Sequence, residues 1–465
     1  AAELKPNDVW HWYNQGNVLS LMGRYEEALN SLQTALNINP QHARSWARLG
    51  NTLRHLQRWD EAVEACQKAT TIAPSYAWAW NEQGITLEAM GRYEEAIFCF
   101  QIASQYAPNE SFYLVKQTDV LLTLNRNHEA AKLLEEALRI DDRNAQIHAQ
   151  YGQTLRRLGR LEEALRQYNT AIEFEQELDW AWNGRGLTLS QMGRHEDALF
   201  SFEKAIELNK NDVWHWYHLA DEQYALNRLT DALNSLDEAL KVNNRHIESW
   251  AKRGQTLRRL GRHNESLTAF DLAVRLNPQY AWAWSGRGLT LKEMGRKEEA
   301  LASYEKAETE DPTTVWYYIN QIDILLEQER RQDALAVIER ALKNVSPNAV
   351  LWARRGQVLR RLRQYEEANM SYDEAIMLEH DYAWAWNGKG LCYAAMKQWE
   401  NARGCYEKAI KYESNDVWYW HNLGEALFYM GDYQQALKTF EYALTIDPNH
   451  QPSLQKLAWT REKLK

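Results

Sequence analysis

Residues 281–314 read AWAWSGRGLTLKEMGRKEEALASYEKAETEDPTT, and this stretch decides the fold because the chain repeats it. Aligned with itself, the sequence shows one unit of 34 residues that recurs without insertion or deletion from Val9 to His450, in 13 copies. The copies begin at Val9, Ala43, Ala77, Ser111, Ala145, Asp179, Val213, Ile247, Ala281, Val315, Ala349, Ala383 and Val417. We number the positions within each copy from 1 to 34.

A few positions keep the same kind of residue in nearly every copy. Position 4 is Trp in ten copies, position 8 is Gly in ten, position 20 is Ala in all but one, and position 27 is Ala in all 13. Position 24 is aromatic or apolar, as in Phe270 and Tyr372. Small residues at fixed helical offsets let two backbones approach closely. We therefore expect each copy to form two helices packed against each other, joined by a turn near position 15.

These residues resemble the pattern of the tetratricopeptide repeat family, which has Trp, Gly, Ala, an aromatic residue, Ala and Pro at these offsets. The resemblance covers about 95% of the chain. It implies an all-α fold, a right-handed superhelical solenoid of 13 helix-turn-helix repeats whose first helices line a concave groove for partners. The Gly at position 8 is replaced by Thr118, Ala220 and Ile322, and we expect the two helices of those repeats to lie slightly further apart.

The same alignment predicts how the chain is organised. Residues 1–8 align with the end of a second helix and are predicted to close a preceding, truncated repeat. Residues 9–450 form the thirteen repeats, and residues 451–465 form an amphipathic capping helix. The chain is thus expected to be the C-terminal part of a larger protein with an upstream domain. Long C-terminal arrays of this kind resemble the target-sensing ends of bacterial NOD-like ATPases or of repeat-bearing protease and kinase regulators.

Composition and motifs exclude several classes of protein. Lys and Arg number 54 against 64 Asp and Glu, and the net charge of −10 has the wrong sign for a protein that binds phosphate backbones. The sequence has no apolar run of 18 residues and no secretory leader. It has no phosphate-binding loop, zinc-protease motif or nucleophile elbow, so we expect no enzymatic activity, no cofactor and no metal. His215 and His218 form the nearest thing to a metal-binding pair, and we expect them on the surface.

The cysteines indicate a compartment. Cys66, Cys99, Cys392 and Cys405 stand in apolar helical surroundings without a Cys-x-x-Cys pair. We interpret them as core thiols, and reduced thiols fit a cytoplasmic location.

A second period of 102 residues is superimposed on the first, because every third copy is more alike than its neighbours. We call the repeats that begin at Val9, Ser111, Val213, Val315 and Val417 type 1. Each is followed by a type 2 repeat and then by a type 3 repeat, except at the end of the chain. On a helical wheel, positions 2, 5, 6, 9, 12 and 13 form a stripe opposite the face that packs on the second helix.

This stripe carries the functional signal. The ten Trp residues at position 4 are expected in the core. Eight more occupy position 2, namely Trp10, Trp78, Trp180, Trp214, Trp282, Trp316, Trp384 and Trp418. A covered Trp side chain buries roughly 150–250 Å² and is a favoured anchor at interfaces.

Polar residues surround these rings in a pattern that depends on the repeat type. Type 2 has Gln or Asn at position 9 and a basic pair at positions 12 and 13, type 3 has Asn or Ser at position 5, and type 1 is mostly acidic at position 9. The Arg guanidinium can form bidentate hydrogen bonds to a carboxylate or a phosphate. Three type 3 repeats have Gly at position 6, where the missing side chain is expected to leave the Trp ring bare and to shape a pocket.

The predicted ligand-binding residues form three pockets and an additional set. The pockets combine Gln153, Arg156, Trp180, Asn183, Leu187, Trp214, Tyr217 and Asp221; Gln255, Arg258, Trp282, Ser285, Leu289, Trp316 and Asp323; and Gln357, Arg360, Trp384, Asn387, Leu391, Trp418 and Glu425. The additional set is Arg54, Trp78, Asn81, Arg157, Arg259 and Arg361.

We expect a non-catalytic module that binds a protein or peptide with acidic and aromatic groups, as the sensor or scaffold part of a larger signalling protein. Two other functions stay open. Trp stacking with Arg pairs is also how sequence-tolerant proteins bind single-stranded nucleic acid, and the array could be a spacer or self-assembling scaffold without a ligand. In a further alternative, duplication of a 102-residue block copied every residue alike, and the position-2 rings and glycines only pack on adjacent helices.

Overall fold

The computed structural model describes residues 7–465, and within this range the regular secondary structure consists of 27 α-helices. The chain divides into two compact units, Ala1–Asn244 and Arg245–Lys465, which we call unit 1 and unit 2 and describe separately. Residues 1–6, on which most of the predicted remnant of a preceding repeat falls, lie outside the described residues.

Unit 1 contains seven helical hairpins. Their first helices are α1 (Val9–Leu21), α3 (Ala43–His55), α5 (Ala77–Ala89), α7 (Ser111–Thr123), α9 (Ala145–Arg157), α11 (Asp179–Gln191) and α13 (Val213–Ala225). Their second helices are α2 (Tyr25–Ile38), α4 (Trp59–Ile72), α6 (Tyr93–Tyr106), α8 (Asn127–Ile140), α10 (Leu161–Phe174), α12 (His195–Leu208) and α14 (Leu229–Val242).

Unit 2 contains six hairpins and a final helix, α27 (Gln451–Lys463). The first helices are α15 (Ile247–Arg259), α17 (Ala281–Glu293), α19 (Val315–Glu327), α21 (Ala349–Arg361), α23 (Ala383–Ala395) and α25 (Val417–Met430). The second helices are α16 (His263–Leu276), α18 (Lys297–Glu310), α20 (Arg331–Asn344), α22 (Tyr365–Leu378), α24 (Trp399–Tyr412) and α26 (Tyr433–Ile446). The predicted all-α array of 13 repeats with a capping helix is therefore confirmed, whereas the right-handed superhelix stays a prediction.

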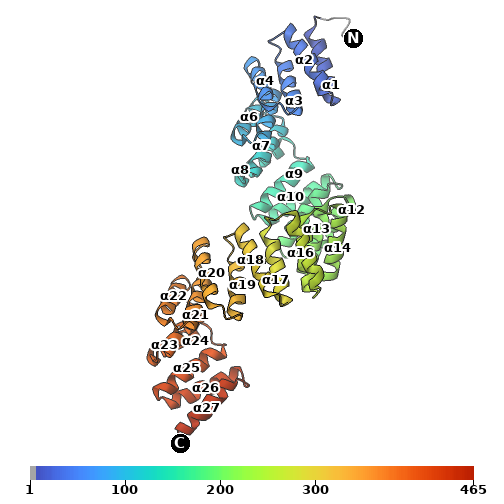
Figure 1. Ribbon diagram of the computed structural model, residues 1–465. Helices are drawn as coiled ribbons and strands as arrows, with labels where there is room; N and C mark the ends of the chain where they lie inside the picture. Colours follow the sequence, from blue (N-terminus) through green and yellow to red (C-terminus); the bar gives the residue numbers. More distant parts are fainter. Residues whose placement is uncertain (1–6) are drawn as a thin grey trace. The chain divides into compact units, whose positions relative to one another are not determined.

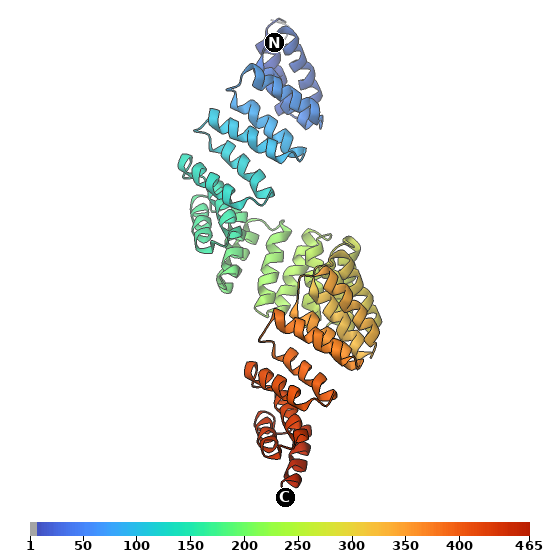
Figure 2. The ribbon, with the colours of Figure 1, turned by 90° about the vertical axis from the view of Figure 1, so that its left-hand side faces the viewer.

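Successive helices pack side by side within each unit. Inside each unit, every helix contacts the next one along the chain, and several first helices also contact the first helix of a neighbouring repeat, as α15 does with α17 (Figure 1). Figure 2 shows the same stacked hairpins in each unit from a second direction. The stripes predicted on neighbouring first helices are therefore adjacent, and they can form a surface together.

A residue with left-handed backbone angles follows each first helix at position 15. It is Gly in seven repeats, with φ between 73° and 87°, and Gly adopts these angles at little cost because it has no Cβ atom. The other six repeats place Gln57, Asn125, Asn227, Glu329, Arg363 and Lys397 there, with φ between 57° and 65°. The expected turn near position 15 is confirmed.

The second helices bury small residues against the first helices. Ala at position 27 is 0% exposed in all 13 repeats, and so is position 20, including the exception Ser266. The Ser266 hydroxyl donates to the backbone oxygen of Gly254 at 2.8 Å, so its polar atom is satisfied inside the core. Burial of all these positions explains why only very small residues occupy them.

The position-24 ring in type 2 repeats fits against glycines of two first helices. A Cβ atom on Gly254 of α15 would lie 2.8 Å from the Phe270 ring, and one on Gly286 of α17 would lie 2.3 Å from it. Tyr168 meets Gly152 and Gly184 in the same way, and Tyr372 meets Gly356 and Gly388. We predicted that the position-6 glycines serve to bare a Trp ring. That explanation was incomplete, because the position-24 ring of the preceding repeat fills the space that a side chain at position 6 would occupy.

Repeats without Gly at position 8 compensate at position 24. Thr118, Ala220 and Ile322 stand at position 8 of repeats whose own position 24 is Leu134, Leu236 and Ile338, and all six residues are 0% exposed. An aliphatic side chain thus replaces the ring where the facing residue is larger. The larger side chain at position 8 is offset by a smaller one at position 24. The two helices therefore do not need the wider spacing that we expected.

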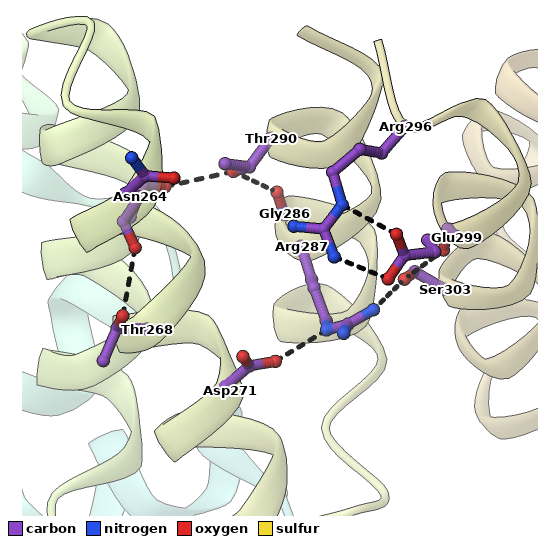
Figure 3. Close-up of polar contacts among 10 residues, drawn as sticks. Asn264, Thr268, Asp271, Gly286, Arg287, Thr290, Arg296, Glu299 and Ser303 are labelled. Carbon is purple, nitrogen blue, oxygen red and sulfur yellow. Dashed lines mark hydrogen bonds and ion pairs between the residues drawn. The ribbon is translucent and has the colours of Figure 1, made fainter. Parts of the chain in front are cut away.

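Basic residues at position 7 tie three helices together. Arg287 of α17 donates from Nε to Asp271 Oδ1 on α16 and from Nη1 to Ser303 Oγ on α18, both at 2.7 Å (Figure 3). Arg185 and Arg355 make equivalent bonds. These charges serve packing between repeats, because each guanidinium is engaged on both sides.

The position-4 tryptophans are less buried than predicted. Only Trp386 is fully buried, at 7% exposed, and the others are partly buried or exposed at their edges. In most of these repeats the indole Nε1 donates to a backbone oxygen six residues earlier, as Trp284 does to Pro278 at 2.8 Å. The indole therefore lies over the loop that precedes its helix, where one edge must stay near solvent.

The four cysteines are buried free thiols. Burial raises the pKa of Cys99 and Cys392 to about 12 and that of Cys405 to about 11. They are unreactive core residues at neutral pH, as predicted. Within the described residues, no helix is both long and apolar enough to cross a membrane.

The contact between ring and glycine makes a prediction about stability. In Gly388→Ala the new Cβ atom would lie 2.4 Å from the Tyr372 ring. Overpacking typically costs about 1–3 kcal/mol and outweighs the gain of about 0.5–1 kcal/mol in helix propensity. We expect a free energy of unfolding lower by about 1–2 kcal/mol, measured by urea denaturation followed by circular dichroism.

The matched control is Gly404→Ala in α24, where a Cβ atom would meet nothing within 4 Å. It should raise the free energy of unfolding by about 0.5–1 kcal/mol. Equal stability of the two variants would show that the ring does not require the glycine.

Candidate functional site: cavities on the first helices

The eight position-2 tryptophans lie on first helices and differ in exposure. Trp10, Trp214, Trp282, Trp316 and Trp418 are 38–52% exposed. Trp78, Trp180 and Trp384 are partly buried. The rings are thus not enclosed between hairpins, and the first five present large apolar areas to solvent.

Most residues of the second predicted pocket, which begins with Gln255, line one cavity in unit 2. This cavity, which we call cavity A, has a volume of about 390 Å³ and is formed by the first helices α15, α17 and α19 with a contribution from α16. Its lining residues are Gln255, Arg258, Phe270, Trp282, Ser285, Gly286, Leu289, Thr314, Trp316 and Tyr317. Six of the seven residues that the sequence combined here lie in this lining. The seventh, Asp323, lines a different cavity.

Sequence reasoning missed Phe270, Thr314 and Tyr317. Phe270 was assigned to the core, and it is only 1% exposed. Its ring nevertheless forms part of the cavity wall because Gly286 has no side chain to cover it. Tyr317 stands at position 3, outside the predicted stripe. The one sequence feature that could have indicated its place in the cavity is that it directly follows Trp316.

Arg258 is not a free anion-binding group. Its Nη1 lies 2.5 Å from Glu293 Oε1, and its side chain is 21% exposed. The partner belongs to the next first helix, at position 13 of the following repeat. To bind Arg258 in the predicted bidentate way, a carboxylate or phosphate would have to displace the Glu293 carboxylate. The interior of cavity A is therefore close to neutral.

Gln255 lines the same cavity, but its side-chain oxygen is not exposed to it. Its Oε1 is buried and has no hydrogen-bond partner. A buried polar atom without a partner costs roughly 1–3 kcal/mol.

Two smaller cavities adjoin each other further along unit 2. Cavity B, of about 320 Å³, is lined by Asp323, Leu326, Glu327, Arg354, Gln357 and Arg361. Cavity C, of about 270 Å³, is lined by Val350, Arg354, Gln357, Tyr382 and Trp384. They share Arg354, which pairs with Asp323 at 3.2 Å and whose guanidinium carbon lies 5.6 Å from the centre of the Trp384 ring. This position-6 cation was not among the predicted residues.

The residues of the third predicted pocket are only partly brought together in cavity C. Gln357 and Trp384 line cavity C, whereas Arg360, Trp418 and Glu425 are not among its lining residues. Asn387 is 8% exposed and accepts a hydrogen bond from Asn422 Nδ2 at 2.9 Å. Glu425 pairs with Lys456 of α27 at 2.5 Å. The predicted set is split because these polar side chains find partners within the protein.

In unit 1 the structure brings together part of the first predicted pocket. Asn183 Oδ1 lies 2.9 Å from His218 Nδ1. The Trp214 ring packs near Tyr217 and His218, with centroids 5.6 and 5.7 Å away. Arg157 is exposed, and its Nη1 donates to the backbone oxygen of Leu122 at 3.3 Å. Gln153, Arg156 and Trp180 are partly buried on neighbouring turns of α9 and α11.

The earliest predicted residues, Arg54, Trp78 and Asn81, are engaged within unit 1. Asn81 is 1% exposed, so it does not present its side chain at the surface. Glu82 accepts hydrogen bonds from Asn51 Nδ2 at 2.7 Å and Arg54 Nη2 at 3.4 Å. The guanidinium of Arg48 stacks over Trp78, with 4.4 Å between the guanidinium carbon and the ring centre.

The expected surface position of His215 and His218 was also wrong. His215 is 1% exposed, and its Nε2 lies 3.1 Å from Asp179 Oδ2 and 4.0 Å from Asp212 Oδ2. The two imidazoles have different partners, so they do not form a chelating pair. Asp179 also accepts from Asn209, and Asp212 caps α13 by accepting from the Trp214 amide. Both carboxylates lie at helix N-termini, whose positive end disfavours a cation.

Comparisons with known proteins identify the class of protein. The fold is that of an all-α helical repeat protein, and models described as tetratricopeptide repeat match residues 13–77, 77–110, 180–212, 217–281, 251–314, 319–376 and 381–449. A model described as TPR repeat matches residues 152–193. The chain belongs to the tetratricopeptide repeat family. Members of this family generally mediate protein–protein interactions, and no catalytic family was detected in this chain.

The chain is also similar to several solved structures, at low sequence identity and with TM-scores below 0.5. A crystal structure of the APC/C hetero-tetramer Cut9–Hcn1 is 13% identical, with a TM-score of 0.43, and covers 97% of this chain and 96% of that one. A structure of MamA is 21% identical, with a TM-score of 0.33 and coverages of 35% and 94%. YrrB, titled a TPR protein with an unusual peptide-binding site, is 24% identical, with a TM-score of 0.34 and coverages of 40% and 96%. No curated protein sequence matches the chain.

The buried histidines predict how stability depends on pH. Burial lowers the pKa of His218 to about 4, and likewise that of His421, whereas an unfolded chain has His pKa values of about 6.5. Between pH 6.5 and 4 the unfolded chain binds more protons, so the free energy of unfolding falls as the pH falls. Each histidine should contribute a loss of about 2 kcal/mol between pH 7.5 and pH 5.

The measurement is urea denaturation of the wild type and of His218→Gln/His421→Gln at both pH values. The double variant should lose less stability on acidification than the wild type. An identical loss in both proteins would assign the pH dependence to other groups.

Proposed function

We propose that this chain is a non-catalytic interaction module that binds a protein or peptide along the first helices of unit 2. The observation that supports this proposal best is cavity A, which the exposed rings of Trp282 and Trp316 line together. Monomeric proteins rarely leave large aromatic side chains exposed together without a partner. Cavities B and C extend the same surface over α19, α21 and α23.

The character of the partner follows from the charges on this surface. Arg258, Asp323 and Arg354 are engaged in ion pairs, so the surface supplies few free charges. Arg361 is exposed at the edge of cavity B without an ion pair. A partner that inserts apolar or aromatic groups fits better than a strongly acidic one. Of the residues that line cavities A, B and C, Arg361 is the one we expect to contact the acidic partner groups predicted from the sequence. A scaffold or sensor role within a larger bacterial signalling protein remains our prediction and rests on the family resemblance, and the cytoplasmic location remains a prediction from the reduced cysteines.

A capture experiment tests the module and its surface together. Wild-type protein and Trp282→Ala/Trp316→Ala would be immobilised and exposed to an extract of the organism that carries the gene. We expect a partner that the wild type retains and the double variant loses at least tenfold, because a Trp hot spot typically contributes 2 kcal/mol or more.

The matched control is Trp459→Ala on α27, which removes an indole that is 45% exposed and lies outside the three cavities. This variant should retain the partner. Equal recovery on all three proteins would contradict the assignment of the surface and favour a spacer without a ligand on these helices.

Binding of single-stranded nucleic acid is the second function to test. Exposed Trp rings favour it, but the net charge of −10 and the pairing of Arg54 and Arg258 with carboxylates oppose it. We expect no binding of a 20-nucleotide oligo-dT even at 50 mM salt, measured by fluorescence anisotropy. Micromolar affinity that falls steeply with salt would overturn this expectation.

A further inference from the structure

We infer that the Trp180 ring and the Asp119 carboxylate, both in unit 1, bind an Arg side chain of a protein partner. This site lies outside cavities A, B and C, so it goes beyond the proposed function and is tested separately from it. Its basis is position 6 of the type 2 repeats, where the chain itself supplies a cation in every block except the one that contains this site.

A guanidinium at position 6 lies between a carboxylate and an indole. Position 6 is basic in three of the four type 2 repeats. Arg354 Nη1 lies 3.2 Å from Asp323 Oδ1 on the preceding first helix, and its guanidinium carbon lies 5.6 Å from the centre of the Trp384 ring on the following one. Arg48 stacks on Trp78 in the same way, at 4.4 Å. The protein thus shows twice how an Arg side chain packs on the position-2 indole of a type 3 repeat.

The fourth type 2 repeat has Gln150 at this position of α9. Its Nε2 donates to Asp119 Oδ1 on α7 at 3.0 Å, so the amide reaches the same carboxylate position that Arg354 reaches in unit 2. A Gln side chain is shorter than Arg and carries no charge. Within the described residues, no Lys or Arg stacks on the Trp180 ring of α11. The carboxylate and the indole are therefore both present in this block, without the guanidinium between them.

Asp119 is also incompletely compensated by its own neighbours. Lys116 Nζ lies 3.5 Å from its Oδ2, and both side chains are about a third exposed. The same ammonium lies 5.7 Å from the centre of the Phe112 ring, away from Trp180. Burial raises the pKa of Asp119 although Lys116 and Gln150 both act to lower it. A second cation close to this carboxylate would stabilise its charged form.

A guanidinium fits this pair of groups better than an ammonium does. It is flat, so it can stack on an indole face while its N–H groups donate to a carboxylate. The basic residue Arg156, at position 12 of the same helix, does not exclude such an occupant, because Arg354 coexists with Arg360 at the same spacing in α21. The net charge of −10 also favours a basic partner segment.

The inference is tested by filling the site with a side chain of the protein itself. Gln150→Arg should place a guanidinium at the site, as Arg354 does in unit 2, and it should fold because the other type 2 repeats carry a basic residue there. Binding of N-acetyl-argininamide to the full chain would be compared by ligand-observed NMR titration with that of its uncharged analogue N-acetyl-citrullinamide. The wild type should bind the arginine probe about fivefold more tightly than the citrulline probe. In Gln150→Arg this preference should be lost.

The converse variant is Arg354→Gln, which removes the guanidinium from Asp323 and Trp384. It should create a second site of the same kind and increase the amount of arginine probe that the chain binds. Circular dichroism would verify that each variant is folded.

The matched control is Gln105→Arg, which adds the same charge at an exposed position of α6 and should keep the preference of the wild type. Equal affinity of the wild type for the two probes, or an equal loss in Gln105→Arg and Gln150→Arg, would overturn the inference. An unchanged preference in Gln150→Arg or no gain in Arg354→Gln would overturn it as well. None of these results depends on cavity A, so the proposed function stands or falls by its own experiment.

Discussion

The arrangement of the type 2 repeats and their neighbours depends on one packing constraint, an aromatic ring held between glycines of two successive first helices. Phe270 occupies the space that side chains on Gly254 and Gly286 would otherwise fill. The ring belongs to the second helix between them, so one contact sets the approach of three helices. Interiors are close-packed, and a ring that fills this space leaves little freedom in how the helices are placed.

The chain also contains a natural variation of this constraint. The first type 2 repeat has Cys66 in place of the ring, and the following repeat has Glu82 in place of Gly at position 6. With a small thiol beneath it, a large side chain is accommodated, and Glu82 uses the space to accept hydrogen bonds from Asn51 and Arg54. Where the ring is present, the glycine leaves the edge of that ring uncovered, and in cavity A this edge becomes part of the wall. The same packing rule therefore produces a cavity in one block and a polar cluster in another.

The fold could be predicted from the sequence because its determinants recur at fixed spacing. Ala at position 27 and the turn at position 15 act within one hairpin, so each of the 13 copies repeats the same local signal. The composition of cavity A was predictable for a related reason: a stripe on a helical wheel places residues on one face whatever their partners are. Six residues of its lining follow from that geometry alone.

The ion pairs and the burial of those residues could not be predicted in the same way, because they depend on single side chains from neighbouring repeats. Arg258 is neutralised by Glu293, but the equivalent position 13 is Ala89, Gln191 and Ala395 in the other type 3 repeats. The block period thus suggested equivalent pockets where the structure has different ones. His218 was interpreted as a surface residue for the same reason, since its partner Asn183 is 35 residues away on another helix. The packing positions are nearly constant because each meets the same neighbours in every hairpin, whereas the stripe varies because no second helix covers it. That freedom lets one solenoid present chemically different sites along a uniform framework.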